Sequence, residues 1–233
     1  MSTDFAYSNL SGRRRGPFLT AAGVVLPGIA HVQDEVVPYA QAWQRDNRAA
    51  LAGAGPLWVA LGDSLTQGIG APAHDRGWVG QLRVRLAEAG QPYRVVNLAV
   101  SGATTGDVLE RQLPAVDALG VRPDLLTLMI GSNDLMRPAR RRGLTGRFEE
   151  LLRRLPAGAV VTTMSNPSRT AAETNRLLVR VAAERGLVVV DLRDPRMASW
   201  RGKLAADHFH PNELGYAAIA DVIGDALLGV AAR

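Results

Sequence analysis

A serine and a histidine–aspartate pair stand where each could take part in nucleophilic catalysis. Ser64 lies in the heptad GDSLTQG at 62–68, directly after an apolar run. A serine between glycines at the end of a strand predicts a sharp turn that exposes its hydroxyl and leaves nearby backbone N–H groups free for an anion. A plain polar turn is the alternative interpretation of the heptad. We treat Ser64 as a candidate nucleophile.

A nucleophilic serine needs a base within hydrogen-bond reach, and the base needs an orienting group. The chain has four histidines, which are His31, His74, His208 and His210. The last two belong to the segment DHFHP at 207–211, which follows the fifth apolar run. Asp207 precedes His210 by three residues. In a loop, this spacing lets the carboxylate bind imidazole Nδ1 and fix the tautomer.

The same segment has an alternative interpretation as a metal site. Aspartate and histidine ligands at 207, 208 and 210 suit zinc or iron. The chain has no cysteine, and no helical motif adds a glutamate. We therefore expect neither a metal nor another cofactor.

The elements that would position these residues follow from the apolar pattern after Ala50. Predicted strands cover 57–61, 94–98, 125–130, 159–164 and 187–192. Predicted helices cover 78–89, 105–119, 145–155, 170–185 and 212–228. Alternation of strands and helices predicts a parallel sheet with helices on both faces. In such a sheet, the site lies beyond the carboxyl ends of the strands.

Several residues predict where helices begin and end. Gly90 and Gly186 suit the left-handed conformation that terminates a helix. Thr170 with Glu173 predicts a capping box at a helix start. Pro211 suits the first position of the last helix, where its missing N–H does no harm.

Four short blocks in this order resemble the GDSL/SGNH hydrolase superfamily. The heptad resembles its first block and Asp207-x-x-His210 its last. Between them, NLAVSG at 97–102 and GSND at 131–134 resemble the two middle blocks. The resemblance extends over about residues 56–229. It implies a three-layer α/β/α, flavodoxin-like fold with a five-stranded parallel sheet.

The resemblance also implies a serine esterase that works through an acyl-enzyme. It makes Ser64 the nucleophile, His210 the base and Asp207 the residue that orients the base. The oxyanion would be bound by the N–H groups of Ser64 and Gly102 and by the Asn133 side-chain amide. Glycine at 102 would leave no Cβ in the path of the substrate oxygen.

Neighbours of these residues are given structural roles. We expect Asp63 and Asp134 to bind loop backbone rather than take part in the chemistry. We expect Thr104 and Thr105 to cap the helix after Gly102.

The expected substrate is a small-molecule ester. Trp78 and Trp200 are candidates for an acyl pocket, with core packing as the alternative for Trp78. Two other functions stay open. One is an acyltransferase to a sugar or other alcohol, which would use the same residues. The other is a non-catalytic binding protein on the same fold, which the intact set of catalytic residue types disfavours.

Composition and charge limit the partners. A chain of 233 residues with 47% apolar content suits one domain with a sizeable core. The net charge is +5, with arginines concentrated at 13–15, 137–142 and 147–154. Solvated surface explains these clusters, and contact with anionic lipid, or of 137–142 with an anionic part of the substrate, is the alternative. Apart from Phe148, no aromatic residue interleaves with them, so nucleic acid is not expected. The oligomeric state stays open.

Residues 1–50 are interpreted as a partly helical N-terminal extension before a hydrolase domain at 51–233. Three arginines precede an apolar stretch at 18–30, a layout that imitates a signal peptide. Pro27 and Gly28 interrupt the stretch, no small-x-small cleavage site follows, and it is too short to span a bilayer. We favour a retained extension that packs on the domain or lies at a surface, and a cytoplasmic location, with membrane association or export through an atypical signal as the alternatives.

Overall fold

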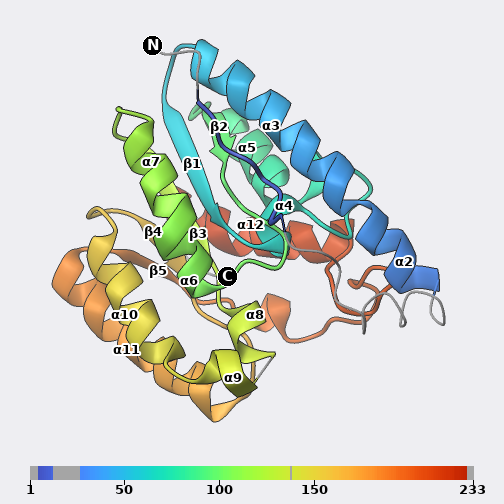
Figure 1. Ribbon diagram of the computed structural model, residues 1–233, viewed down its shortest axis with the longest axis vertical. Helices are drawn as coiled ribbons and strands as arrows, with labels where there is room; N and C mark the ends of the chain where they lie inside the picture. Colours follow the sequence, from blue (N-terminus) through green and yellow to red (C-terminus); the bar gives the residue numbers. More distant parts are fainter. Residues whose placement is uncertain (1–4, 13–26, 137, 230–233) are drawn as a thin grey trace.

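The computed structural model describes residues 5–12, 27–136 and 138–229, and its centre is a parallel β-sheet (Figure 1). The five strands lie in the order β2-β1-β3-β4-β5. Their bounds are β1 Leu57–Gly62, β2 Arg94–Asn97, β3 Leu125–Met129, β4 Val160–Thr162 and β5 Val188–Val190. All five predicted strands and the flavodoxin-like fold class are thereby confirmed.

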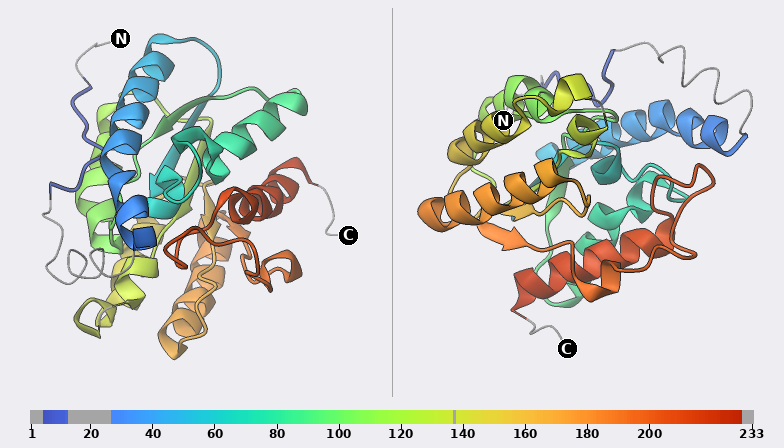
Figure 2. Two further views of the ribbon diagram at one scale, coloured as in Figure 1. Left: turned by 90° about the vertical axis from the view of Figure 1, so that its right-hand side faces the viewer. Right: turned by 90° about the horizontal axis from the view of Figure 1, so that it is seen from below.

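The helices that follow β1 are α4 Ser64–Gln67, η1 His74–Arg76, α5 Trp78–Glu88, α6 Thr105–Asp107, the π-helical η2 Val108–Gln112, α7 Leu113–Ala118, α8 Ser132–Leu135, α9 Pro138–Arg141, α10 Leu144–Arg154, α11 Arg169–Arg185, η3 Pro195–Met197 and α12 Glu213–Leu228. Helices α5 and α12 pack together on one face of the sheet, and α7, α10 and α11 lie on the other (Figure 2).

Strand β1 shows how the sequence produces these layers. All six of its residues are buried, as expected for a parallel strand covered on both faces. Trp58 and Ala60 belong to the apolar cluster formed with α5 and α12. Val59 and Leu61 belong to the cluster formed with α10 and α11. Successive side chains thus point into different halves of the core. The strand that leads to Ser64 is therefore packed on both faces.

The predicted capping box at Thr170 is wrong. Helix α11 begins at Arg169, and Ser168 is its N-cap, with its hydroxyl accepting the Ala171 N–H at 3.3 Å. Glu173 instead pairs with Arg169 at 2.8 Å, one helical turn away. Both serine and threonine favour the N-cap position, and the residue with the extended backbone takes it.

The start of α12 also differs from the prediction. Asn212 is the N-cap, and its side chain accepts the N–H groups of Leu214 and Gly215. Pro211 precedes this cap and forms an isolated antiparallel bridge with Leu204. The helix ends predicted from glycine are confirmed, with left-handed φ values at Gly90 (+80°) and Gly186 (+66°).

Two N-terminal helices, α2 Pro27–Asp34 and α3 Val36–Ala52, precede the sheet. Helix α3 packs along β2 at the sheet edge and buries Trp43 and Asn47. It runs across the expected domain boundary at residue 50, which remains a prediction. The arginines at 13–15 and most of the apolar stretch at 18–30 lie outside the described residues. Among the described helices, none has the length and apolarity needed to cross a bilayer.

Candidate active site

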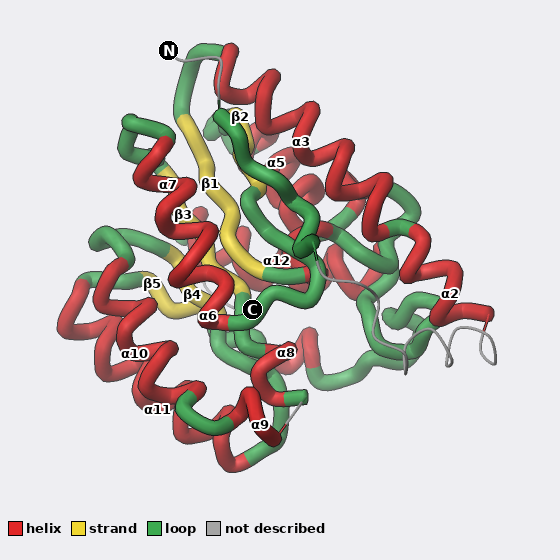
Figure 3. The backbone as a smooth tube through the Cα atoms, in the orientation of Figure 1, coloured by secondary structure: helices red, strands yellow, loops and turns green. Residues whose placement is uncertain are grey.

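Ser64 is the first residue of α4 and lies two residues after the end of β1, a strand drawn in yellow in Figure 3. Asp63 caps this short helix by accepting the Leu65 N–H at 3.1 Å. The strand order reverses beside β1, because β2 lies on one side of it and β3 on the other. Ligands of open parallel sheets bind at such a point, beyond the carboxyl ends of the strands. The predicted nucleophile therefore stands at the expected edge of the sheet.

The structure brings Ser64, His210 and Asp207 into one hydrogen-bonded row. His210 Nε2 lies 3.0 Å from Ser64 Oγ, and His210 Nδ1 lies 2.6 Å from Asp207 Oδ2. The side chains of His210 and Asp207 are 9% and 7% exposed, so water is largely kept from both. A carboxylate only accepts hydrogen bonds, so Nδ1 carries a proton. In a neutral imidazole, Nε2 is then free to accept the proton of Ser64.

Asp207 is held in its ionised form. Burial by itself raises the pKa of its carboxyl group. The hydrogen bonds that it accepts from the His210 ring and from the N–H groups of Phe209 and His210 outweigh burial, and the pKa lies below its ordinary value. The carboxylate can therefore stabilise the imidazolium that forms when His210 takes a proton.

The loop that carries the pair, residues 203–212, closes on itself through its backbone. The Ala205 N–H donates to His210 O at 2.8 Å, and the Asn212 N–H donates to Lys203 O at 2.9 Å. Gly70 packs directly under the histidine, where an added Cβ would lie 2.9 Å from His210 Cβ and 2.6 Å from Pro211 O. Gly70 also has a φ of +95°, so glycine is required there for two independent reasons.

The other histidines stand apart from Ser64. His74 Nε2 pairs with Asp46 Oδ2 at 2.7 Å on the other side of α4. His208 is exposed and adopts a left-handed φ of +54°, and the side chain of His31 is 75% exposed. In the part of the chain that the structure describes, no group of three histidine or carboxylate side chains is arranged to hold a metal ion.

Two backbone N–H groups near the site, those of Ser64 and Gly102, have no protein acceptor among the described residues. Gly102 has a φ of +77°, a conformation that favours glycine. An added Cβ would meet no protein atom within 4 Å. The backbone conformation thus favours glycine at position 102. Access for a substrate oxygen, the reason expected from the sequence, is a second and separate one.

Asn133, in α8 after β3, presents its side-chain amide to the same region. Its Nδ2 donates to Asp63 Oδ2 at 3.1 Å and to Ala103 O at 3.0 Å. Ser132 Oγ also donates to Asp63 Oδ2, at 3.3 Å. Burial raises the pKa of Asp63 to about 6, and the Leu65 N–H limits the rise. Asp63 therefore links the end of β1 to the end of β3 and orients Asn133.

The structural roles given to neighbouring residues are confirmed with one exception. Asp63 and Asp134 bind loop backbone as expected, Asp134 through the Thr105 N–H at 2.9 Å. Thr104 caps α6 and forms a capping box with Asp107. Thr105 is not a cap, because its hydroxyl donates to Asp134 at 3.2 Å instead.

A cavity of about 230 Å³ opens beside Ser64 at the carboxyl ends of β3, β4 and β5. Every methionine in the described residues lines it, namely Met129, Met136, Met164 and Met197. Trp200 also lines it, as the sequence suggested, whereas Trp78 packs in the core against Trp58. Methionine side chains are flexible and polarisable, so such a lining adapts to apolar groups of different shape.

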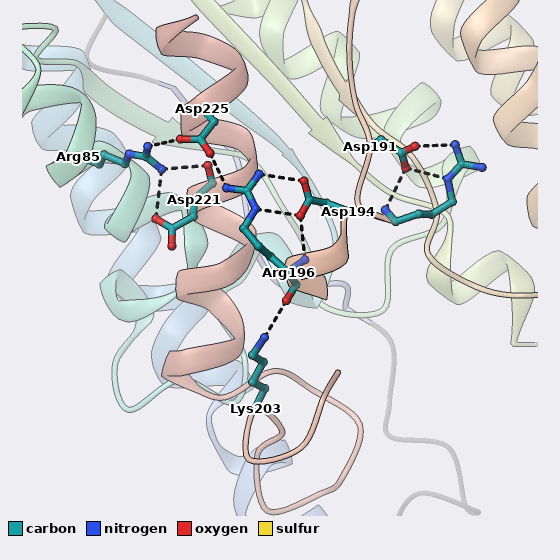
Figure 4. Close-up of polar contacts among 8 residues, drawn as sticks. Arg85, Asp191, Asp194, Arg196, Lys203, Asp221 and Asp225 are labelled. Carbon is teal, nitrogen blue, oxygen red and sulfur yellow. Dashed lines mark hydrogen bonds and ion pairs between the residues drawn. The ribbon is translucent and has the colours of Figure 1, made fainter. Parts of the chain in front are cut away.

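One wall of this cavity is held by the ion-pair network in Figure 4. Arg196, in η3, binds Asp194 at 2.8 Å and also binds Asp225 of α12. Asp225 pairs in turn with Arg85 of α5. The network joins η3 to α5 and α12, which cover one face of the sheet. Because η3 ends at Met197, the network also fixes a residue that lines the cavity.

A sequence profile of the GDSL-like lipase/acylhydrolase family matches residues 60–218. The chain belongs to this family. Esterase TesA of Pseudomonas aeruginosa is 30% identical to it over 160 residues, which cover 66% of this chain and 78% of TesA. A solved structure of TesA has a TM-score of 0.64 at 26% identity and covers 73% of this chain and 97% of that one. The acetylxylan esterase Axe2 from Geobacillus stearothermophilus shares the fold, with a TM-score of 0.60 at 23% identity, over 75% of this chain and 95% of Axe2.

Membership of this family makes the chain a carboxylic ester hydrolase, and an ester is its substrate. Some of the described arginines in these clusters are engaged with the backbone of the esterase itself. Arg141 donates to Leu135 O, and Arg147 donates to Arg140 O and pairs with Asp134. Contact of 137–142 with an anionic substrate, contact with anionic lipid and the absence of nucleic acid remain predictions.

Two supporting glutamines escaped sequence reasoning. Gln112 is fully buried, and its side chain both accepts the Gly62 N–H at 2.9 Å and donates to Gly62 O at 2.8 Å. It completes the hydrogen bonding of the chain just before Ser64. Gln67, also fully buried, binds the loop before Gly102 through the Ser101 N–H at 2.9 Å. The π-helical turn η2 ends at Gln112, and such turns are frequent at functional sites.

Proposed function

We propose that the esterase acts as a serine hydrolase with Ser64 as nucleophile, His210 as general base and Asp207 as the residue that orients His210. The observation that carries the proposal is the unbroken row from Ser64 Oγ through the imidazole to Asp207, at 3.0 Å and 2.6 Å. His210 takes the Ser64 proton as Oγ attacks the ester carbonyl. The same proton then passes to the leaving alcohol, and water or another alcohol releases the acyl group.

The negative charge on the carbonyl oxygen would be bound by three donors. The free N–H groups of Ser64 and Gly102 supply two of them. The Asn133 amide supplies the third by exchanging its bond to Ala103 O for a bond to the substrate oxygen. Its second bond, to Asp63, keeps the amide oriented meanwhile. Each such donor contributes about 3 kcal/mol of transition-state stabilisation.

Hydrolysis and acyl transfer share every one of these steps up to the acyl-enzyme. Rapid quenching of a p-nitrophenyl ester reaction, followed by peptide mass spectrometry, should find one acyl group on Ser64. Added glycerol or a sugar should then leave the rate of p-nitrophenol release unchanged if hydrolysis dominates. Acylated acceptor as the main product would favour the transferase function, and an acyl group on any other residue would contradict the proposal.

We further propose that the methionine-lined cavity receives the acyl chain. Ser165 is exposed at this cavity, and no side-chain hydrogen bond would be lost by substituting it. Ser165→Trp should lower kcat/KM for an octanoate ester about tenfold more than for acetate, because excluding about two methylenes from the cavity, at about 0.8 kcal/mol each, corresponds to that factor. Val84→Trp is the matched control, since Val84 is 51% exposed on α5 and lies outside the cavity. Equal losses on both esters would show that the acyl chain lies elsewhere.

A further inference from the structure

The described residues 5–12, named here the N-terminal strap, lie across the loop that leads to Gly102. The strap is the dark blue segment that runs beside α3 toward α4 in Figure 1. It lies outside residues 60–218, over which the family profile matches. Family membership therefore assigns it no role.

Asn9 is the centre of the strap and is completely buried, with 0% exposure. Its side-chain amide donates to the carbonyl oxygens of Asn97 and Ala99, both at 2.9 Å. Its side-chain oxygen accepts a hydrogen bond from Asn47 of α3 at 3.3 Å. Its backbone carbonyl accepts a hydrogen bond from Gln67 of α4 at 2.9 Å. Every polar group of the Asn9 side chain is thus engaged, a costly arrangement to leave incomplete in a buried site.

The strap binds three successive carbonyl groups of this loop. Tyr7 OH donates to Leu98 O at 2.6 Å, between the two carbonyls that Asn9 binds. Gln67, which also binds Asn9 O, donates to Ala99 O and accepts the Ser101 N–H, both at 2.9 Å. The residue after Ser101 is Gly102. The loop is therefore bound both by the strap and by α4, the helix that begins with Ser64.

We propose that the strap positions the oxyanion-binding N–H of Gly102, and that Asn9 is the positioning residue through which it acts. The inference rests on the role proposed above for Gly102. An oxyanion donor is effective only when it is already aimed at the charge that develops, and a displaced donor loses most of its contribution. Because the strap contacts the loop and not the substrate, its loss would affect the transition state more than substrate binding.

The test compares full-length variants on a p-nitrophenyl acetate assay. Asn9→Asp keeps the shape and the acceptor of the side chain but removes both N–H donors. Because it leaves a carboxylate beside two carbonyl oxygens, it should lower kcat about tenfold or more with KM changed less than twofold. Asn9→Ala should behave in the same way. Tyr7→Phe removes a single hydroxyl and is the milder variant, with an expected loss of about threefold in kcat. Ser8→Ala is the matched control, since Ser8 is exposed on the strap and, within the described part of the chain, its hydroxyl has hydrogen bonds only with Leu10 N and Gln44.

A second measurement separates positioning from packing. A trifluoromethyl ketone forms a hemiketal with the nucleophile and places a negatively charged oxygen in the oxyanion site. Its inhibition constant should rise in parallel with the loss of kcat/KM in the Asn9 and Tyr7 variants. Folded Asn9 and Tyr7 variants with wild-type kcat and wild-type inhibition would overturn the inference, as would a loss that appears only in KM. If the Asn9 variants do not fold, Tyr7→Phe decides.

Ser64→Ala, assayed beside these variants, separates the two proposals. An inactive Ser64→Ala with unaffected strap variants would reject the strap alone. An active Ser64→Ala would reject the proposed nucleophile.

Discussion

Ser64→Ala is expected to lower kcat for any ester substrate by about 10⁶-fold, because without Oγ no acyl-enzyme forms. The fold should be unaffected. Ser64 makes its side-chain contact with His210, and alanine is a good helix former at the first position of α4. Binding of the ester should persist, because the cavity and the backbone N–H groups do not depend on the hydroxyl. The variant thus isolates the chemical step.

Steady-state hydrolysis of p-nitrophenyl esters measures this loss, and a fluorophosphonate gives an independent readout. The wild-type chain should gain one phosphonyl group, located at Ser64, and Ser64→Ala should gain none. Ser8 is an exposed serine near the N-terminus, distant in sequence from Ser64, and Ser8→Ala should react as the wild type does. Comparable hydrolysis by Ser64→Ala and the wild type would refute the nucleophile.

Asp207→Asn is expected to lower kcat about 10⁴-fold while the site keeps its shape. An asparagine amide can turn its N–H₂ group toward His210 Nδ1 and donate to it. The imidazole would then carry its proton on Nε2, facing Ser64, and could not accept the serine proton. The carboxylate that stabilises the imidazolium would also be lost. Both effects act on the transition state, so KM should change little.

The chain offers a matched control for this substitution. Asp46 pairs with His74 at 2.7 Å, close to the 2.6 Å between Asp207 and His210, but the pair does not include Ser64. Asp46→Asn should retain wild-type kcat. A loss in Asp46→Asn equal to that in Asp207→Asn would mean that loss of any His–Asp pair damages the fold, and the orienting role of Asp207 would lose its support.

The pH dependence of stability follows from the lowered pKa of Asp207. A carboxyl group whose pKa is depressed by folding stabilises the native state above its unfolded pKa of about 3.9. That contribution is lost as the pH falls through the lower pKa of the folded state. The unfolding free energy of Asp207→Asn, followed by circular dichroism, should therefore be lower than that of the wild type at neutral pH, and the difference should shrink as the pH falls through the pKa of Asp207.

Much of this site could be predicted because its signals are local in the sequence. The apolar run before Ser64 predicts a buried strand, and the glycines around it predict a turn at the strand end. Asp207 and His210 are three residues apart, so their contact needs only a loop of the right shape. Gly102 and Asn133 carry weaker signals, and their assignment came from the resemblance of ordered blocks rather than from either residue alone.

What escaped prediction depends on contacts between distant parts of the chain. Asn9 binds carbonyls 88 and 90 residues away, and Gln112 binds Gly62 across 50 residues. A single polar residue forms no periodic pattern, and the residues next to it in the sequence do not indicate which distant group it binds. The cap of α11 was misplaced for a different reason. Ser168 and Thr170 both have the side chain of an N-cap, and only the backbone conformation distinguishes them.

The separations within the catalytic row also bear on how the esterase is made on the ribosome. His210 and Asp207 are three residues apart, but His210 and Ser64 are separated by 146. A nascent chain exposes Ser64 and Gly102 long before it contains His210. Domains fold largely as units once their elements are complete. With His210 as the proposed base, Ser64 would therefore lack a base until the last helix docks against α5, and hydrolytic activity would appear only together with the finished fold.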